Sequence, residues 1–121
     1  MTISVLLADD SEIMRKAIAN LFEDDPEIQV LAEAASLSQT VQFIRSLHPQ
    51  IVVMDIHMGE KGNVTSSQVK SCLVGSQLLA ISLWKDEETK ALADSYGAVV
   101  LLDKSKLAYE LIPAIKLHAK E

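Results

Sequence analysis

Short apolar runs alternate with segments of helical period along almost the whole chain. A run that is apolar at successive positions is typical of a strand buried on both faces, as strands of parallel sheets are. Ile3–Ala8 and Ile51–Met54 have this character, and three further segments are also predicted to be strands: Ile28–Ala34, Leu78–Ser82 and Ala98–Leu102. The pattern therefore predicts five strands, each followed by a helical segment.

Helix signals lie between these runs. The predicted N-caps are Ser11, Ser36 (as a capping-box pair with Gln39) and Asp86. Residues 64–74 should form a helix by the alternation, although their Val, Thr and Ser residues are poor helix formers. The last helix is expected from about residue 106 to the end of the chain, with a kink at Pro113, which lacks a backbone donor.

Five strand-then-helix units indicate a parallel sheet with right-handed crossovers. The common order for five such strands is 2-1-3-4-5, with helices on both faces, so the sequence predicts an α/β, flavodoxin-like, doubly wound fold. The chain has 121 residues and shows no linker or repeat, and residues 1–121 are expected to form one domain.

Composition narrows the classes of function. No apolar run approaches the ~18 residues that span a bilayer, and no secretory leader is visible, so a cytoplasmic location is expected. The net charge of −6, without a Lys/Arg cluster, would repel a phosphate backbone, so this segment should not bind nucleic acid by itself. The one cysteine, Cys72, excludes an internal disulfide and is expected to be a buried small hydrophobe.

Polar residues stand at or just after the carboxyl ends of four of the predicted strands. They are Asp9 and Asp10, Asp55, Ser82, and Lys104. Because the carboxyl ends of parallel strands meet along one edge, these side chains should share one site. Two carboxylates ~5 Å apart repel by roughly 3 kcal/mol at an effective dielectric constant of ~20, so the three acids need a counter-charge.

The chemistry of this group favours phosphoryl transfer. Carboxylate oxygens select Mg²⁺, while Lys104 supplies a second cation and Ser82 a hydroxyl donor. A carboxylate can accept a phosphoryl group as an acyl phosphate, and Asp55 is the natural nucleophile. The side chain of His57 is expected at the rim and not as a ligand, because neutral imidazole suits zinc better than magnesium.

These residues belong to strings that together resemble a known family. LLADDSEIMRKAI, IVVMDIHM, LLAISL and GAVVLLDKS resemble the response-regulator receiver domain of two-component signalling, over essentially the whole chain. EIQVLAEAAS resembles receivers that precede a helix-turn-helix DNA-binding domain. The resemblance implies a histidine kinase or phosphotransfer protein as phosphodonor, an output domain or partner protein as target, and a homodimer as one arrangement.

The resemblance also implies a role for each site residue. Asp55 would accept the phosphoryl group, and Ser82 and Lys104 would contact its oxygens. Asp10, Asp55 and the backbone carbonyl of His57 would bind Mg²⁺ directly, and Asp9 would bind it through water. The domain would not be an enzyme in the ordinary sense, although Mg²⁺-dependent self-phosphorylation and slow autodephosphorylation are expected.

Four features depart from the family pattern. Gly59 and Asn63 stand where proline and glycine are usual, and Leu83 replaces the small residue after the hydroxyl of the fourth strand. Leu101 stands where the family has an aromatic switch residue. Ser105 replaces the common proline after the lysine, so the usual cis bond is not expected.

Two other functions compete with the phosphorylation switch. A pseudo-receiver would be a constitutive protein-interaction module with a relic pocket, and Leu83 and Leu101 favour it. A phosphatase with an aspartyl intermediate fits poorly, because those enzymes carry an Asp-x-Asp pair after the first strand. Nucleotide binding has no support, since the chain lacks both glycine-rich phosphate loops.

Overall fold

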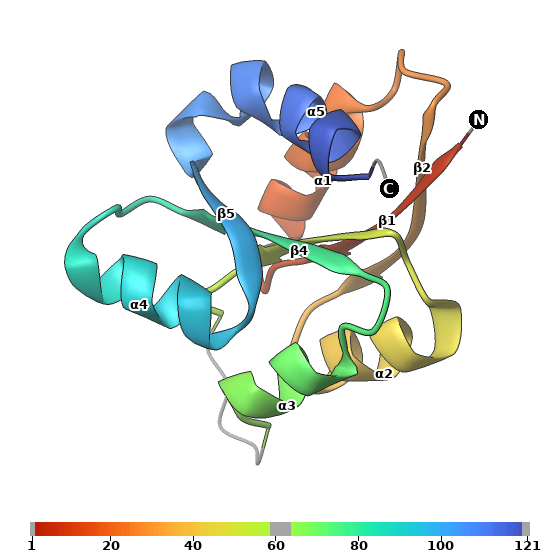
Figure 1. The fold of residues 1–121 in the computed structure, drawn as a ribbon. Helices are drawn as coiled ribbons and strands as arrows, with labels where there is room; N and C mark the ends of the chain where they lie inside the picture. Colours follow the sequence, from red (N-terminus) through yellow and green to blue (C-terminus); the bar gives the residue numbers. More distant parts are fainter. Residues whose placement is uncertain (1, 59–63, 120–121) are drawn as a thin grey trace.

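A single parallel sheet forms the centre of the computed structural model, which describes residues 2–58 and 64–119 (Figure 1). Its strands are β1 (Ile3–Ala8), β2 (Ile28–Ala34), β3 (Ile51–Asp55), β4 (Gln77–Ser82) and β5 (Ala98–Asp103). Their order is β2-β1-β3-β4-β5 and every pairing is parallel. The predicted fold class and strand order are confirmed.

The helices alternate with these strands as predicted. They are α1 (Glu12–Leu21), α2 (Leu37–Leu47), α3 (Ser66–Cys72), α4 (Glu87–Ser95) and α5 (Leu107–His118), with a 3₁₀ turn η1 (Lys104–Lys106) before α5. Ser11, Ser36 and Asp86 each accept a hydrogen bond from a backbone N–H in the first turn. The helix continues through Pro113, which lies inside α5.

The capping-box prediction was wrong in its position. The Gln39 side chain accepts from the N–H of Ala35 at 2.8 Å and not from that of Ser36, so α2 has only half of the box. The reciprocal pair is found at α3, where Thr65 Oγ1 accepts from the N–H of Gln68 and the Gln68 side chain accepts from the N–H of Thr65. This cap explains why α3 forms from poor helix formers and begins at Ser66.

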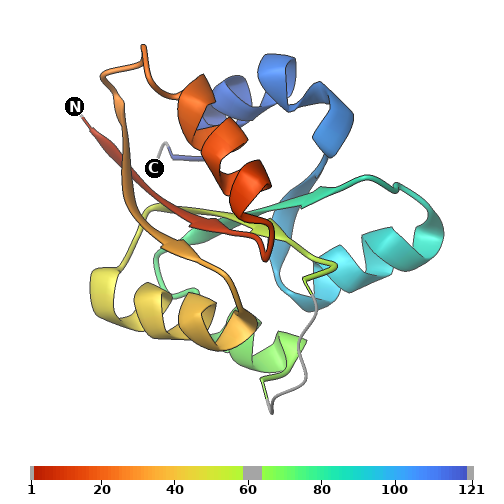
Figure 2. The ribbon, with the colours of Figure 1, turned by 180° about the vertical axis from the view of Figure 1, so that it is seen from behind.

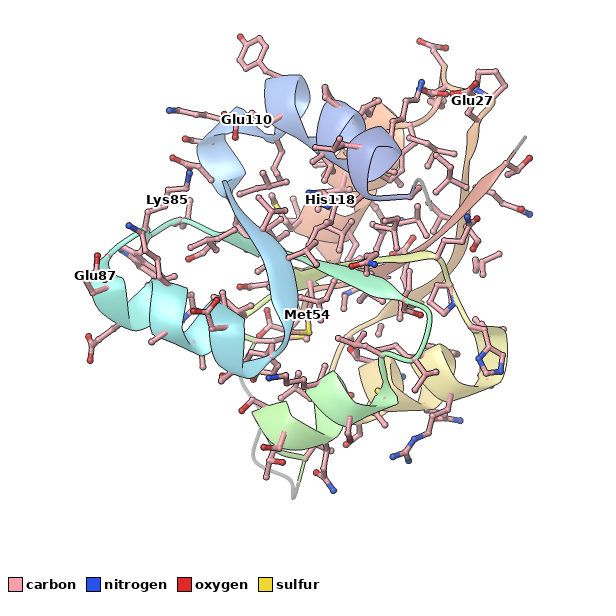
Figure 3. All side chains as sticks on the ribbon, in the orientation of Figure 1. Glu27, Met54, Lys85, Glu87, Glu110 and His118 are labelled. Carbon is pink, nitrogen blue, oxygen red and sulfur yellow. The ribbon has the colours of Figure 1, made fainter. Side chains whose placement is uncertain are left out.

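Helices cover both faces of the sheet, and each face has its own core. Figures 1 and 2 show α1 and α5 together on one side and α2, α3 and α4 on the other. On the first side, Ile18 of α1 and Leu111 and Ile115 of α5 pack against alternate strand residues. On the second, Ile44 of α2 and Val69 of α3 pack against the opposite set, which includes Met54 (Figure 3). The three central strands β1, β3 and β4 are therefore mostly buried on both faces, which is why they are apolar at nearly every position.

Two smaller expectations concern membranes and Cys72. None of the described helices is long and apolar enough to cross a membrane. Cys72 is half-buried at the end of α3, where its thiol donates to the Val69 carbonyl at 3.1 Å, and burial raises the pKa of the thiol. The residue is thus less buried than predicted.

An ion-pair cluster joins α5 to the loop before β2 and makes part of the stability depend on pH. Lys116 Nζ lies 3.0 Å from both Asp25 Oδ2 and Glu27 Oε1, and Figure 3 labels Glu27 on that loop. The hydrogen bond from Lys116, with a backbone bond from Glu27, holds the pKa of Asp25 below its ordinary value. A lowered carboxyl pKa contributes stability above the pKa of the unfolded chain, which is lost as the pH falls through the folded pKa.

We expect Lys116→Met to lower the urea midpoint slightly at neutral pH, and the difference from wild type to shrink as the pH falls and Asp25 becomes protonated. The measurement is a series of urea denaturation curves between neutral and acid pH. Lys90→Met is the control, because Lys90 forms only an exposed pair with Glu87 at 3.6 Å. A difference that stays constant with pH would mean that Lys116 acts through packing alone.

Candidate functional site

The residues singled out in the sequence gather at the carboxyl edge of the sheet. Asp9 and Asp10 follow β1, and Asp55 and Ser82 are the last residues of β3 and β4. Lys104 is the first residue of η1, directly after β5. The reason is local: Asp103 accepts from the N–H of Ser105 at 2.9 Å and so caps the 3₁₀ turn.

Three carboxylates form an acidic cluster where β1 and β3 lie side by side. One oxygen from each of Asp9, Asp10 and Asp55 lies within 4.8 Å of the others, and no other such group of three is found among residues 2–58 and 64–119. Asp9 and Asp55 are buried, with 1% and 7% of their surfaces exposed, whereas Asp10 is exposed. The cluster is thus closed toward the core and open at Asp10.

Lys104 provides the counter-charge to both buried acids. Its Nζ lies 3.1 Å from Asp9 Oδ2 and 3.1 Å from Asp55 Oδ2. Burial by itself would lower the pKa of the ammonium, but close contacts with the two carboxylates outweigh it, so the pKa is raised. Lys104 therefore keeps its positive charge throughout the physiological pH range.

In each buried carboxylate, one oxygen accepts a hydrogen bond from the adjacent turn and the other faces the pocket. Asp9 Oδ1 accepts from the N–H of Ser11, and Asp55 Oδ1 accepts from the N–H of His57, both at 2.9 Å. The two turns thereby fix the carboxylates and leave both Oδ2 atoms facing Lys104. The positions of the reactive oxygens follow from backbone hydrogen bonds that form with the fold.

The acidic cluster fits a hard divalent cation. Asp9 Oδ2 is buried, and apart from the ion pair with Lys104 at 3.1 Å it makes no hydrogen bond among the described residues. A buried oxygen without a donor is costly unless a cation or water completes it. Carboxylate oxygens at this spacing are the ligand type that Mg²⁺ takes, with waters filling its remaining positions.

Arg15 is a positioning residue that the sequence analysis missed. Its Nη1 donates to the backbone carbonyl of Asp9 at 2.6 Å, and its Nε donates to Glu33 on β2 at 2.9 Å. Only 14% of its side chain is exposed. Arg15 thus ties the turn that carries Asp9 and Asp10 to the neighbouring strand, and the charge pattern alone did not distinguish it from a solvated helix residue.

A short chain of contacts leads from the pocket to the surface. Ser82 is fully buried, and its Oγ accepts from the backbone N–H of Trp84 at 3.0 Å. The Trp84 ring meets the His57 ring edge to face, with centroids 5.1 Å apart and planes at 89°. The His57 side chain is exposed at the rim, as predicted.

The departures from the family pattern fall at different depths. Leu83 is 62% exposed, whereas Leu101 is half-buried and packs at the edge of the core on the α2–α4 side. The described residues contain no cis peptide bond, so the bond before Ser105 is trans as expected. Gly59, Gly62 and Asn63 lie outside the described residues.

Curated sequences that are similar to this chain include methylesterases and a transcriptional regulator. It is 33% identical over 102 residues to a protein-glutamate methylesterase/protein-glutamine glutaminase of Paramagnetospirillum magneticum, covering 84% of this chain and 29% of that protein. It is 30% identical over 119 residues to the transcriptional regulatory protein LiaR of Bacillus subtilis, covering 98% of this chain and 56% of LiaR. The chain therefore spans about a third to half of these relatives.

Solved structures share the fold. The receiver domain of the putative response regulator NarL from Mycobacterium tuberculosis superimposes with a TM-score of 0.85 at 22% identity, covering 98% of this chain and 96% of that one. The response regulator domain of Thermotoga maritima CheB gives 0.83 at 22% identity, covering 98% and 97%. The family described as the response regulator receiver domain matches residues 5–116. The chain belongs to the response-regulator receiver domain family.

Proposed function

We propose that this domain is a phosphorylation-dependent signalling switch and that Asp55 accepts the phosphoryl group from a histidine kinase or phosphotransfer protein. The observation that supports this most directly is the position of Asp55 Oδ2 within the acidic cluster, 3.1 Å from Lys104 Nζ. In the reaction a carboxylate oxygen of Asp55 attacks phosphorus, an acyl phosphate forms, and the donor leaves with the electron pair of its bond.

The surrounding residues have distinct roles in this proposal. Asp10, Asp55 and the backbone carbonyl of His57 would hold Mg²⁺ directly and Asp9 through water, and the metal would neutralise charge that develops on the phosphoryl oxygens. Lys104 offers a second cation to the same oxygens. Ser82 Oγ already accepts from Trp84, so its own hydrogen is available to donate to a phosphoryl oxygen.

The conformational change would be transmitted through Ser82. This residue pairs in register with Asp103, the residue before Lys104, so a shift of Ser82 toward a phosphoryl group moves the adjoining ends of β4 and β5 together. A change there would alter the surface offered to an output domain, a partner protein or a second copy in a homodimer. Leu101 has no ring, so this output would not use an aromatic side chain on β5.

The relatives suggest what the switch controls. We propose that residues 1–121 form one receiver domain in the cytoplasm, the compartment of its proposed phosphodonor. The names of longer relatives indicate either a transcriptional regulator or a methylesterase as output. Because the net charge is −6, any DNA contact would come from another domain or chain.

Incubation with acetyl phosphate and Mg²⁺, followed by intact mass measurement, tests the proposal. We expect the mass to rise by one phosphoryl group and then to return slowly as the acyl phosphate hydrolyses. A parallel sample in EDTA should stay unmodified. No mass gain in a folded protein with Mg²⁺ would contradict the proposal.

The pseudo-receiver remains the second candidate because of Leu83 and Leu101. A relic pocket would not bind Mg²⁺ at physiological concentration, whereas a working pocket would. Trp84 is the one tryptophan of the chain and is linked to the site through Ser82, so a change in tryptophan fluorescence on adding Mg²⁺ comes from a residue next to the pocket. Quenching by millimolar Mg²⁺ would count against the pseudo-receiver, and an unchanged signal would support it.

A further inference from the structure

A groove lies beside the proposed phosphorylation site and is lined in part by α4. Its volume is about 640 Å³, and it is lined by His57, Trp84, Asp86, Glu88, Thr89, Ala91 and Leu92. The lining comes from the ends of β3 and β4 and from the first two turns of α4. The groove is therefore separate from the acidic cluster but built on the same loops.

The walls of the groove combine an exposed aromatic surface with negative charge. Trp84 is 56% exposed, which is unusual for an indole, and His57 holds its ring from one side. Ala91 and the half-buried Leu92 add apolar surface on α4. An exposed aromatic surface beside apolar side chains is typical of a contact surface.

Among the described residues that line the groove, the charged ones are Asp86 and Glu88, and none is a lysine or arginine. Hydrogen bonds from the hydroxyl and the N–H of Thr89 hold the pKa of Asp86 below its ordinary value, so that carboxylate is ionised at neutral pH. Among the described residues Glu88 has no ion-pair partner, unlike its neighbour Glu87, which pairs with Lys90. Its described lining thus carries two carboxylates and no lysine or arginine.

We propose that this groove is a docking site for a basic segment of a partner protein, in which a lysine or arginine lies beside an apolar side chain. The cation would stack on Trp84 and face the two carboxylates, while the apolar side chain would cover Leu92. An acidic or phosphate-bearing ligand would be repelled. A second copy of this chain is the poorer occupant because each copy carries a net charge of −6.

The groove is joined to the proposed phosphorylation site by two short routes. The N–H of Trp84 donates to Ser82 Oγ, and the N–H of His57 donates to Asp55 Oδ1. If Ser82 turns toward a phosphoryl group on Asp55, the backbone that carries Trp84 shifts with it. We therefore expect affinity for the basic segment to depend on phosphorylation, a step that rests on the proposed function.

The probe for this test is the pentapeptide acetyl-RLKLR-amide, titrated into the full chain in the absence of phosphodonor. Binding is measured from Trp84 fluorescence and by calorimetry. We expect saturable binding with a Kd of roughly 0.1–1 mM, as suits a short peptide, weakening as salt is added. The peptide acetyl-ELELE-amide should not bind.

Matched variants locate the binding. Glu88→Gln should weaken binding roughly two- to fivefold, the range for one exposed charge pair, and Glu88→Lys should weaken it further. Glu87→Gln should leave it unchanged, since Glu87 lies at the outer end of α4 in Figure 3 and does not line the groove. Equal effects of Glu87→Gln and Glu88→Gln, or equal binding of both peptides, would overturn the docking site.

Measurements on the phosphorylated protein test whether phosphorylation changes the affinity for the peptide. They also distinguish a failure of the docking site from a failure of the proposed function. We expect acetyl phosphate with Mg²⁺ to change the Kd at least about threefold in wild type. It should leave the Kd of Asp55→Asn unchanged. If acetyl phosphate with Mg²⁺ leaves the protein unmodified while the peptide still binds, the proposed function is contradicted and the docking site stands. If the protein is phosphorylated but does not bind the peptide, the docking-site proposal is wrong. If the Kd is unchanged after phosphorylation, peptide affinity does not depend on phosphorylation.

Discussion

Asp55→Asn is expected to abolish phosphoryl acceptance and to leave the domain folded. An amide has the shape of the carboxylate but cannot form an acyl phosphate under these conditions. The change also removes one negative charge from the cluster, while Asp9 keeps Lys104 at 3.1 Å. Since repulsion falls and the central ion pair survives, the free energy of unfolding without Mg²⁺ should be unchanged or higher.

Intact mass after incubation with acetyl phosphate and Mg²⁺ measures the first effect, and urea denaturation measures the second. Asp24→Asn, which changes an exposed acid in the loop before β2, is the control and should be labelled like wild type. Equal labelling of the Asp55 variant would place the acceptor elsewhere. A large loss of stability would show that Asp55 is needed for folding, so that its lost labelling could not identify the acceptor.

The sheet could be predicted from the sequence because its strands are buried on both faces. Burial on two sides requires apolar residues at successive positions, and a polar residue marks the end of such a run. Asp9 and Asp55 end such runs, so their neighbourhood followed from strand order alone. The cluster is thus the part of the site that depends least on side-chain detail.

The contacts within the site could not be predicted in the same way. That Lys104 reaches both Asp9 and Asp55, and that each acid presents Oδ2, depends on turns whose hydrogen bonds form only in the folded chain. The bond from Arg15 to the Asp9 carbonyl is of the same kind. A charged residue on a helix gives no sign in the sequence that it will fold back onto the preceding turn.

The contact between the rings of His57 and Trp84 could be predicted only in part. In the register of β3 with β4, Asp55 lies opposite Ile81, so residues two or three positions beyond each strand can meet. Strand order and this register would have placed the two rings near each other. The groove beside them depends also on the direction of α4, which the sequence does not give.

Lys104→Met is expected to destabilise the domain strongly, and added Mg²⁺ is expected to restore much of the lost stability. Methionine keeps the apolar stem but removes the charge that lies 3.1 Å from both buried acids. The side chain of Lys104 is only 14% exposed, and breaking a largely buried pair leaves uncompensated charge. We expect the free energy of unfolding in EDTA to fall by about 2–4 kcal/mol.

Added Mg²⁺ should recover much of this loss, because a cation bound by the acidic cluster supplies the missing positive charge and binds only the folded state. Urea denaturation in EDTA and at millimolar Mg²⁺ measures both effects. Lys106→Met, at an exposed lysine of the same 3₁₀ turn, should change stability little under either condition. If the loss were as large with Mg²⁺ as without it, Lys104 would act by packing, and the acidic cluster would not be the cation site proposed above. A loss confined to EDTA would tie the lysine and the metal to the same three carboxylates.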